Sequence, residues 1–233
     1  MRIPRIFLDQ ELTKNKTYKL DKESFHHLLV IKKREGDKIE LFNSKGQFLI
    51  ASISSINKKT CEIFSIGEIK TQEQTFPKIS LGISEIKNFE KILNEVTQLG
   101  VYRVDCLSSE RSKFLKKPSE KKIERWKKVI IGACEQSGNN WMPQIGHMTL
   151  EEWQTKIPSE NKFYLNPGEN KNIESLSRFD EIYFSIGPEG GFSQEEIDKM
   201  KSNGLEGISL GELVIKTETV PTVLLSMLKI LNK

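Results

Sequence analysis

Short apolar segments alternate with turn-forming residues along the first third of the chain. Between residues 5 and 69, runs rich in β-branched and aromatic residues are broken by turns such as residues 43–46, a pattern typical of short strands. It predicts a small β-barrel with one helix at residues 24–30. Residues 70–77 are polar, lack periodicity and end in proline, so they predict a linker. The predicted strands are RIFL, TYKL, KIELF, QFLIASISSI and TCEIFSI.

The rest of the chain alternates between strand and helix patterns. Asn88 is placed to cap one helix, and Gly100 to end it in the left-handed conformation. This alternation predicts an α/β fold with a mainly parallel sheet. We therefore divide the chain into a β domain at residues 1–72 and an α/β domain at residues 73–233. The predicted strands of the second domain cover residues 78–83, 101–107, 162–165, 181–186 and 207–210, and its helices cover residues 88–100, 119–138, 193–201 and 220–231.

The composition excludes several classes of protein. The 233 residues are 36% hydrophobic and 29% charged, which is typical of globular chains and excludes disordered and fibrous ones. The apolar runs are too short to span a bilayer, and the first residues lack the apolar stretch of a secretory signal. Cys61, Cys106 and Cys134 form no CxxC pair, so we expect no zinc site, no disulfide and a cytoplasmic location.

Positive charge is concentrated in two stretches of the chain. The formal net charge is +4, yet residues 1–72 hold 14 Lys and Arg against 9 Asp and Glu, and residues 101–135 hold 10 against 5. Two basic zones of this kind are suited to a single polyanion such as a nucleic acid. Charge by itself equally fits lysines that are simply solvated.

The loop after the predicted strand at residues 181–186 has the features of a ligand site. In a parallel α/β sheet, ligands bind beyond the carboxyl ends of the strands. This loop reads GPEGGFS, and Ser193 with Glu196 forms a capping box that opens a helix. Its glycines let backbone amides approach a ligand such as an adenosine. It lacks the GKS or GKT ending of a P-loop and the GxGxxG of a dinucleotide fold. The alternative is a tight strand-to-helix turn.

Two further loops lie at the same predicted edge. Residues 210–219, LGELVIKTET, precede the last helix, where Thr219 is a suitable N-cap and Pro221 is tolerated in the first turn. A capped helix entry does not explain the apolar run at residues 213–215, which is suited to the wall of a pocket for a flat aromatic ligand. Residues 166–168, Asn-Pro-Gly, form an ordinary turn unless they share that pocket.

A segment rich in amide groups follows the helix at residues 119–138. The sequence EQSGNNWMP at residues 135–143 offers groups that can hydrogen-bond the edge of an unstacked base. The same groups also serve in helix C-caps and turns. Trp141 is able to stack on a base or to cover the sheet, and burial is the commoner role of a tryptophan.

Taken together, these motifs carry a family resemblance. The segments IGPEGGFSxxE, LGxxxxxTET, EQSGxxxxP, SERS at residues 109–112, PRIF and GDxIxLF resemble those of the RsmE family over essentially the whole chain. Members of that family are SPOUT-class methyltransferases that methylate N3 of a uridine in small-subunit ribosomal RNA. The resemblance implies a PUA-like barrel for RNA, a C-terminal domain with a deep trefoil knot, S-adenosylmethionine as cofactor, a homodimer, and ribosomal RNA or the small ribosomal subunit as partner.

The resemblance also assigns site residues. Thr217, Glu218 and Thr219 match the knot motif. Arginine is usual in the family at four positions where this chain has Lys32, Asn139, Leu213 and Lys216; the first and last keep the charge but lose the bidentate fork, and the other two lose the charge as well. The cofactor-binding residues that the resemblance implies are Leu165, Gly187, Glu189, Gly190, Gly191, Leu210, Gly211, Val214, Ile215, Thr217 and Thr219.

Methyl transfer to N3 of a uridine requires the loss of a proton but no metal. His26, His27 and His147 are scattered in the sequence, and we expect no metal site. Cations such as Arg111 or Lys113 are expected to stabilise the uridine anion, and Glu218 or a water to take the proton. The residues expected to grip RNA are Arg5, Lys32, Lys33, Arg34, Arg111, Lys113, Lys116, Lys117 and Asn139.

Two other classes of protein remain open at this stage. One is a noncatalytic RNA-binding or ribosome-assembly factor that keeps the fold but transfers no methyl group. The other is a nucleotide-binding enzyme that uses the GPEGGF loop for phosphates, although the missing Lys-Ser/Thr pair argues against it.

Overall fold

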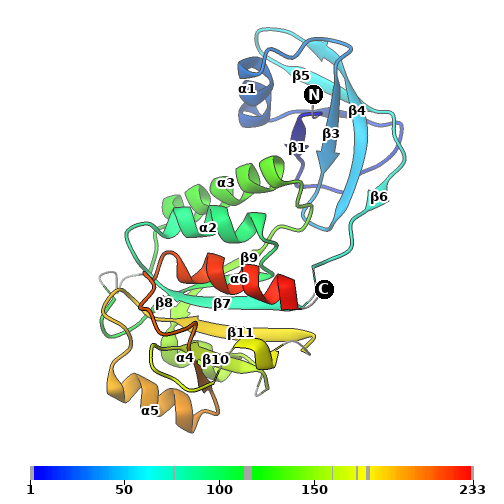
Figure 1. Ribbon diagram of the computed structural model, residues 1–233. Helices are drawn as coiled ribbons and strands as arrows, with labels where there is room; N and C mark the ends of the chain where they lie inside the picture. The colour runs from blue at the N-terminus through cyan, green and yellow to red at the C-terminus, as the bar shows by residue number, and fades with distance from the viewer. Residues whose placement is uncertain are drawn as a thin grey trace. The chain divides into compact units, whose positions relative to one another are not determined.

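The chain forms two compact units. The computed structural model describes residues 3–75, 77–112, 117–158, 160–171, 173–176 and 179–231, and Figure 1 traces them. The N-terminal unit comprises Met1–Gln74 together with Ile131–Met142, and the C-terminal unit comprises Thr75–Ile130 and Pro143–Lys233. The place of residues 131–142 in the first unit was not predicted.

The N-terminal unit is built on a six-stranded sheet. All of its strand pairs are antiparallel except β1 with β3. The strand order is β1-β3-β4-β5-β2, and β6 pairs with β4. Alternation is clearest in β5, whose residues are buried and exposed in turn, because one face of the strand packs on the core. The elements are β1 (Arg5–Phe7), β2 (Thr17–Lys19), α1 (Lys22–Val30), β3 (Lys38–Phe42), β4 (Gln47–Ile56), β5 (Cys61–Ser65) and β6 (Lys70–Thr71).

The predicted linker at residues 70–77 is wrong at its first two residues. Lys70 and Thr71 form β6 and pair with β4, and the Gln72 amide continues the ladder to the Gly46 carbonyl at 2.9 Å. Strand pairing therefore overrides the polar composition of this short stretch. Helix α1 starts two residues earlier than predicted, because the Asp21 side chain caps it by accepting a hydrogen bond from the Ser24 amide at 2.7 Å.

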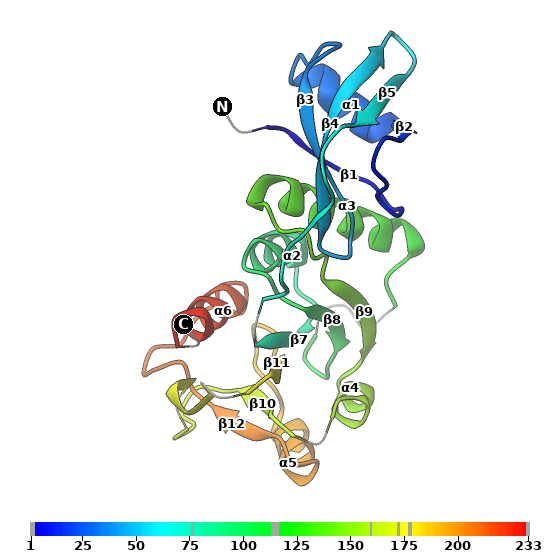
Figure 2. The same cartoon turned by 90° about the vertical axis from the view of Figure 1, so that its right-hand side faces the viewer.

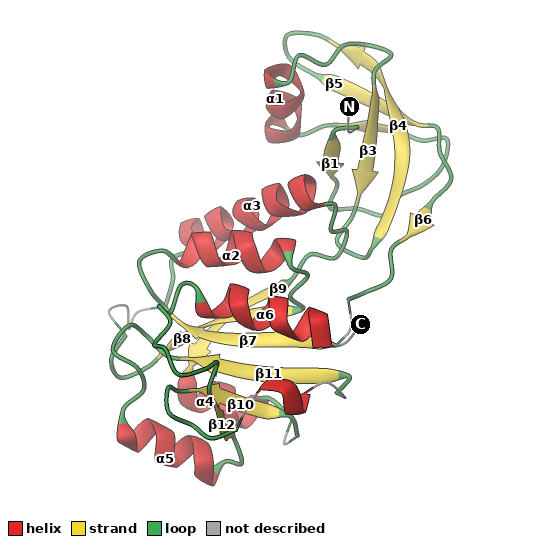
Figure 3. Ribbon diagram, in the orientation of Figure 1, coloured by secondary structure: helices red, strands yellow, loops and turns green. Residues whose placement is uncertain are grey.

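The C-terminal unit contains an all-parallel sheet, which confirms the predicted α/β fold. Its strand order is β12-β10-β11-β7-β8-β9. Helices α2 and α6 pack together on one face of the sheet, and α4 and α5 cover the other face (Figure 2, Figure 3). The strands are β7 (Lys78–Ser84), β8 (Arg103–Ser108), β9 (Gln144–Thr149), β10 (Lys162–Leu165), β11 (Glu181–Ile186) and β12 (Glu206–Ile208). The helices are α2 (Phe89–Gln98), α3 (Glu120–Ser137), α4 (Leu150–Lys156), the 3-10 helix η1 (Ile173–Leu176), α5 (Gln194–Ser202) and α6 (Val220–Leu231).

Some local predictions for this unit hold and others do not. Gly100 has a φ of +73°, as expected for a residue that ends a helix in the left-handed conformation. Asn88 occupies the N-cap of α2, but its side chain makes no capping hydrogen bond. Strand β9, helix α4 and η1 were not predicted. β9 is an edge strand with partly exposed residues on both faces, so it lacks the alternation that identifies a strand.

Three findings concern the cysteines, possible metal ligands and possible membrane-spanning helices. The cysteines Cys61, Cys106 and Cys134 are all free and buried. Within the described residues, no group of three or more His, Cys, Asp or Glu side chains is arranged to hold a metal ion. No helix in the described part of the chain has both the length and the apolar character needed to cross a membrane.

Candidate functional site

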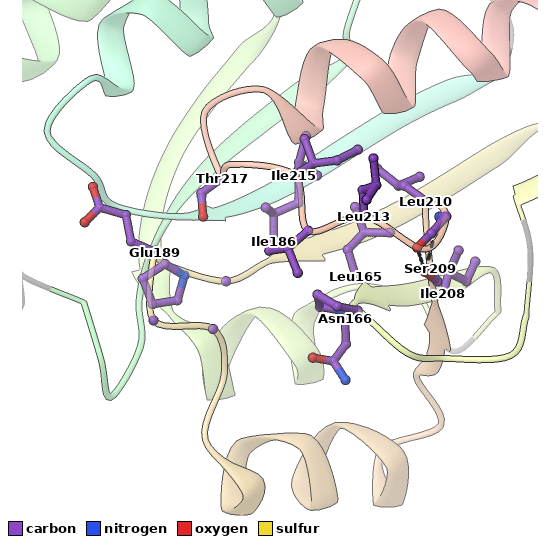
Figure 4. Close-up of a pocket in the computed structure, with 18 residues that line it drawn as sticks. Leu165, Asn166, Ile186, Glu189, Ile208, Ser209, Leu210, Leu213, Ile215 and Thr217 are labelled. Atoms are coloured by element: carbon purple, nitrogen blue, oxygen red, sulfur yellow. Dashed lines mark hydrogen bonds between the residues drawn. The ribbon is translucent and has the colours of Figure 1, made fainter.

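The loops that follow β10, β11 and β12 meet at the carboxyl edge of the sheet and enclose a cavity of about 290 Å³. The three strands are neighbours in the sheet, so the loops converge as the parallel topology predicts. Figure 4 shows side chains from all three loops around the hollow. The lining residues are Leu165, Asn166, Pro167, Ile186, Gly187, Pro188, Glu189, Gly190, Gly191, Ile208, Ser209, Leu210, Gly211, Leu213, Val214, Ile215, Thr217 and Val220.

The loop after β11 is shaped by its glycines and by the helix that follows. A Cβ on Gly187 would lie 3.2 Å from the Phe192 amide nitrogen, so a larger residue would crowd the return of the loop. The predicted capping box is confirmed, because Ser193 Oγ accepts from the Glu196 amide and the Glu196 carboxylate accepts from the Ser193 amide at 2.9 Å. The loop therefore enters α5 in a fixed geometry and leaves its glycines facing the cavity.

The loop after β12 supplies the apolar wall. Ser209 Oγ donates to the Gly211 carbonyl at 2.9 Å, and Gly211 has a φ of +125°, a conformation that favours glycine. Beyond this turn, Leu213 and Val214 are 85% and 80% exposed and line the cavity. Two adjacent apolar side chains that are this exposed and line a cavity are suited to contact with a ligand.

The loop after β10 shares the cavity and is not an isolated turn. Asn166 and Pro167 line the cavity. The Asn166 amide donates to the Ile208 carbonyl at 3.1 Å, which joins this loop to the end of β12.

Most of the residues expected to bind a cofactor come together here. Ten of the eleven line the cavity, and Thr219 does not. Several lining residues were absent from that expectation, because strand-end positions such as Ile186 and Ile208 are ordinary apolar residues in the sequence. Their signal is positional: each one ends a strand of the sheet next to a glycine-bearing or polar loop.

Arg111 contacts the glycine loop directly. Its Nη1 donates to the carbonyl of Gly190 at 3.0 Å and to that of Phe192 at 3.4 Å. The neighbouring Glu110 amide donates to Glu196 Oε1 at 2.8 Å, so the SERS segment contacts both the loop after β11 and the first turn of α5. Glu218 is half-buried just ahead of α6 and is not among the residues that line the cavity.

Arg5 does not face solvent, and the expectation that it grips RNA is wrong. The residue is 4% exposed, and its guanidinium is committed within the N-terminal unit. Its Nε pairs with Glu40 at 2.7 Å, Nη1 donates to the Cys134 carbonyl and Nη2 to Asn140 Oδ1. Its guanidinium carbon lies 4.3 Å from the centre of the Phe42 ring. Arg5 therefore fixes residues 131–142 to the sheet.

The amide-rich segment is also structural. Asn139 Oδ1 accepts from the Trp141 amide at 2.9 Å, and the Trp141 indole donates to the Gln72 carbonyl at 2.8 Å. A Cβ on Gly46 would lie 2.5 Å from the Trp141 ring. Of the two roles considered for Trp141, the structure therefore supports covering the sheet of the N-terminal unit. The polar groups of this segment hydrogen-bond within the turn and to the neighbouring backbone at Gln72.

The remaining basic candidates follow α1 and the SERS segment in the sequence. Lys32 and Arg34 are exposed, and Lys33 is partly buried, 3.9 Å from Asp37. Lys117 is exposed. Lys113 and Lys116 lie outside the described residues.

Comparison with known proteins defines the class of this molecule. A family model for an RNA methyltransferase domain matches residues 72–229, and a model for an RNA methyltransferase PUA domain matches residues 20–64. The parallel sheet, the three-loop cavity and these matches define a SPOUT-type RNA methyltransferase fold with a PUA-like N-terminal domain, as expected from the sequence.

Individual relatives narrow the class to one family. Ribosomal RNA small subunit methyltransferase E of Buchnera aphidicola (strain Sg) is 31% identical, with 98% of this chain and 96% of the relative covered. The same enzyme from Neisseria gonorrhoeae, solved with S-adenosylmethionine, has a TM-score of 0.92 at 27% identity, covering 99% and 98%. A methyltransferase from Legionella pneumophila, also solved with that cofactor, has a TM-score of 0.91 at 30% identity over 99% and 98%. The chain belongs to the ribosomal RNA small subunit methyltransferase E family.

Proposed function

We propose that this chain binds S-adenosylmethionine in the three-loop cavity and methylates N3 of a uridine in small-subunit ribosomal RNA. The observation that carries the proposal is the convergence of the three loops into one cavity with apolar walls and glycine backbone. Two relatives of similar fold were solved with this cofactor. The proposal includes the homodimer, the trefoil knot and the cytoplasmic location that the family resemblance implies.

The residues of the cavity fit the chemistry of the cofactor. Ile186, Leu210 and Ile215 offer apolar surface to an adenine ring, and Asn166 and Ser209 offer hydrogen-bonding groups. Among the described residues other than Gly191 and its two chain neighbours, no heavy atom lies within 4 Å of a Cβ built at Gly191. Backbone therefore remains accessible to a ligand at this point.

Bound S-adenosylmethionine supplies a methyl group activated on a sulfonium. The chain must then hold the uridine in line and stabilise the loss of its N3 proton. Arg111 is placed at the loop after β11, and its charge is suited to the developing uridine anion. Glu218 or a water is proposed as the acceptor of the proton. In the transfer the methyl–sulfur bond breaks, the N3–methyl bond forms, and the proton leaves to that acceptor.

The exposed cations of the N-terminal unit are proposed to contact RNA phosphates. Replacing Lys32, Lys33 and Arg34 together by Ala should weaken RNA binding and lower the salt slope by about one for each phosphate that is no longer neutralised. Cofactor affinity should stay unchanged. The double variant K58A/K59A, in an exposed turn of the same unit, is the matched control. An unchanged salt slope in the triple variant would exclude this surface from RNA binding.

The proposed function is tested in two steps. Calorimetry with S-adenosylmethionine should show binding to the purified chain. ATP with magnesium should not compete with S-adenosylmethionine for the cavity; competition would instead favour the nucleotide-binding alternative. Mass spectrometry of ribosomal RNA from cells with and without this chain should then show one methylated uridine that depends on it. Binding of RNA without any transferred methyl group would instead identify a noncatalytic assembly factor.

A further inference from the structure

Glu169 lies in the loop after β10, and its side chain contacts both that segment and strand β12. Its Oε1 accepts a hydrogen bond from the Tyr164 hydroxyl at 2.9 Å and from Asn166 Nδ2 at 3.3 Å. Tyr164 lies on β10, and Asn166 begins the loop after it. We infer that Glu169 is a positioning residue for the cofactor cavity, an inference that depends on the proposed function.

The carboxylate of Glu169 also packs against β12. Gly207 is the register partner of Tyr164 across the β10–β12 ladder. A Cβ on Gly207 would lie 2.4 Å from Glu169 Cδ, 2.6 Å from its Oε2 and 2.7 Å from its Cγ. The three nearest atoms thus all belong to one side chain, so a residue with a Cβ at position 207 would displace Glu169 from this position. Glu169 therefore fills the space over the backbone of β12 just before that strand reaches the cavity.

Backbone hydrogen bonds connect the loop that contains Glu169 to the end of β12 and to residues that line the cavity. The Asn166 amide donates to the Ile208 carbonyl at 3.1 Å, and the Ser209 amide donates to the Lys171 carbonyl at 3.2 Å. Asn166, Ile208 and Ser209 all line the cavity. A displacement of Glu169 would consequently move both loops at once.

The hydrogen bond to Glu169 also sets the chemical character of Asn166. Because Nδ2 is donated to the carboxylate, Oδ1 remains as the acceptor that Asn166 can offer to an N–H group of a ligand. Figure 4 shows Asn166 among the residues around the cavity. Burial and the hydrogen bond to Glu169 raise the pKa of Tyr164, so its hydroxyl stays protonated and donates to the same carboxylate. The triad of Tyr164, Asn166 and Glu169 therefore has a single orientation.

The test compares E169A, G207A and the double variant E169A/G207A by calorimetry with S-adenosylmethionine, with thermal unfolding measured in parallel. E169A and G207A should each raise the Kd at least tenfold. The double variant should bind no more weakly than E169A, because the added methyl group then meets the space that Glu169 has left. E206Q is the matched control: Glu206 is on the same strand but pairs with Lys171 at the surface, and its Kd should stay within twofold of wild type.

The outcomes separate this inference from the proposed function. If the wild-type chain binds no S-adenosylmethionine, the proposed function fails. If wild type binds and E169A has the same Kd, the inference alone fails, even if E169A melts at a lower temperature, because Glu169 would then be a purely structural residue. If the losses of binding free energy in E169A and G207A simply added in the double variant, the inference would also fail. If E169A does not fold, G207A carries the test, since it displaces the carboxylate without removing it.

Discussion

Substitution of the buried Arg5 tests whether this residue stabilises the fold, as its contacts indicate, or binds RNA, as the charge pattern of the sequence suggested. Its side chain is 3% exposed and that of Glu40 is 23% exposed. Replacing Arg5 with Met leaves the Glu40 carboxylate and Asn140 Oδ1 without the Arg5 donors, while the Cys134 carbonyl keeps the hydrogen bond from the Gly138 amide at 3.1 Å. Breaking a buried pair in this way costs about 3–5 kcal/mol. For a protein of this size each kcal/mol lowers the Tm by about 2–4 °C, so R5M should melt about 6–20 °C below wild type.

Differential scanning calorimetry or circular dichroism measures this loss. R5K keeps the charge but not the fork of donors, so its Tm should fall between those of R5M and wild type. The double variant R5M/E40M should recover part of the loss, because no unpaired buried charge remains. A wild-type Tm for R5M combined with weaker RNA binding would refute the reasoning and restore the role in RNA binding that the sequence suggested.

Three further predictions follow from the site and the buried groups. Leu213→Ala should leave the Tm unchanged, because the side chain is 85% exposed, yet weaken S-adenosylmethionine affinity roughly tenfold by calorimetry, since about 1.5 kcal/mol of burial in the complex is lost; equal affinities would exclude Leu213 from the ligand wall. Arg111→Lys should raise the Kd a few-fold and slow methyl transfer, because an ammonium replaces the guanidinium whose Nη1 donates to the Gly190 and Phe192 carbonyls; kinetics identical to wild type would contradict this. Burial raises the pKa of the Glu135 carboxyl above its ordinary value of 4.5, so at pH values between the unfolded and the folded pKa the folded state binds more protons than the unfolded state. The free energy of unfolding therefore falls as the pH rises through that range. Urea unfolding of E135Q should show a weaker dependence of this free energy on pH, and a larger free energy than wild type at about pH 7.

The elements that the sequence predicted are those with a strong local signal. Strand β5 shows the alternation of a strand with one buried face, and α2 buries Phe89, Ile92, Leu93 and Val96 at helical spacing. Strand β9 carries no comparable period, and α4 is only seven residues long, so its burial of Trp153 comes from tertiary packing. Local periodicity cannot report contacts of this kind.

In the site, too, the features with a local signal were predicted and those that depend on tertiary contacts were not. The glycine loop and the capping box are local features, and parallel topology is sufficient to bring the three loops together. The roles of Arg5 and Asn140 could not be derived in this way, because they depend on a contact between residues 135 positions apart. A count of charges treats Arg5 and Lys32 alike, although one is buried and hydrogen-bonded and the other faces solvent. Glu169 was missed because it packs against Gly207 of β12, and a glycine leaves no signal in a pattern of charges.

Helix α3 begins in the C-terminal unit, and its last residues belong to the N-terminal unit. During synthesis, a nascent chain of 74 residues therefore lacks the peptide that Arg5 holds, and the first unit cannot complete its packing until about 70 further residues have left the ribosome. Truncation at the apparent end of the β domain would release a fragment in which Arg5 keeps Glu40 but loses the Cys134 carbonyl and Asn140, and in which the sheet loses the cover of Trp141. A circularly permuted or split version of this protein would need to keep residues 131–142 with the rest of the N-terminal unit.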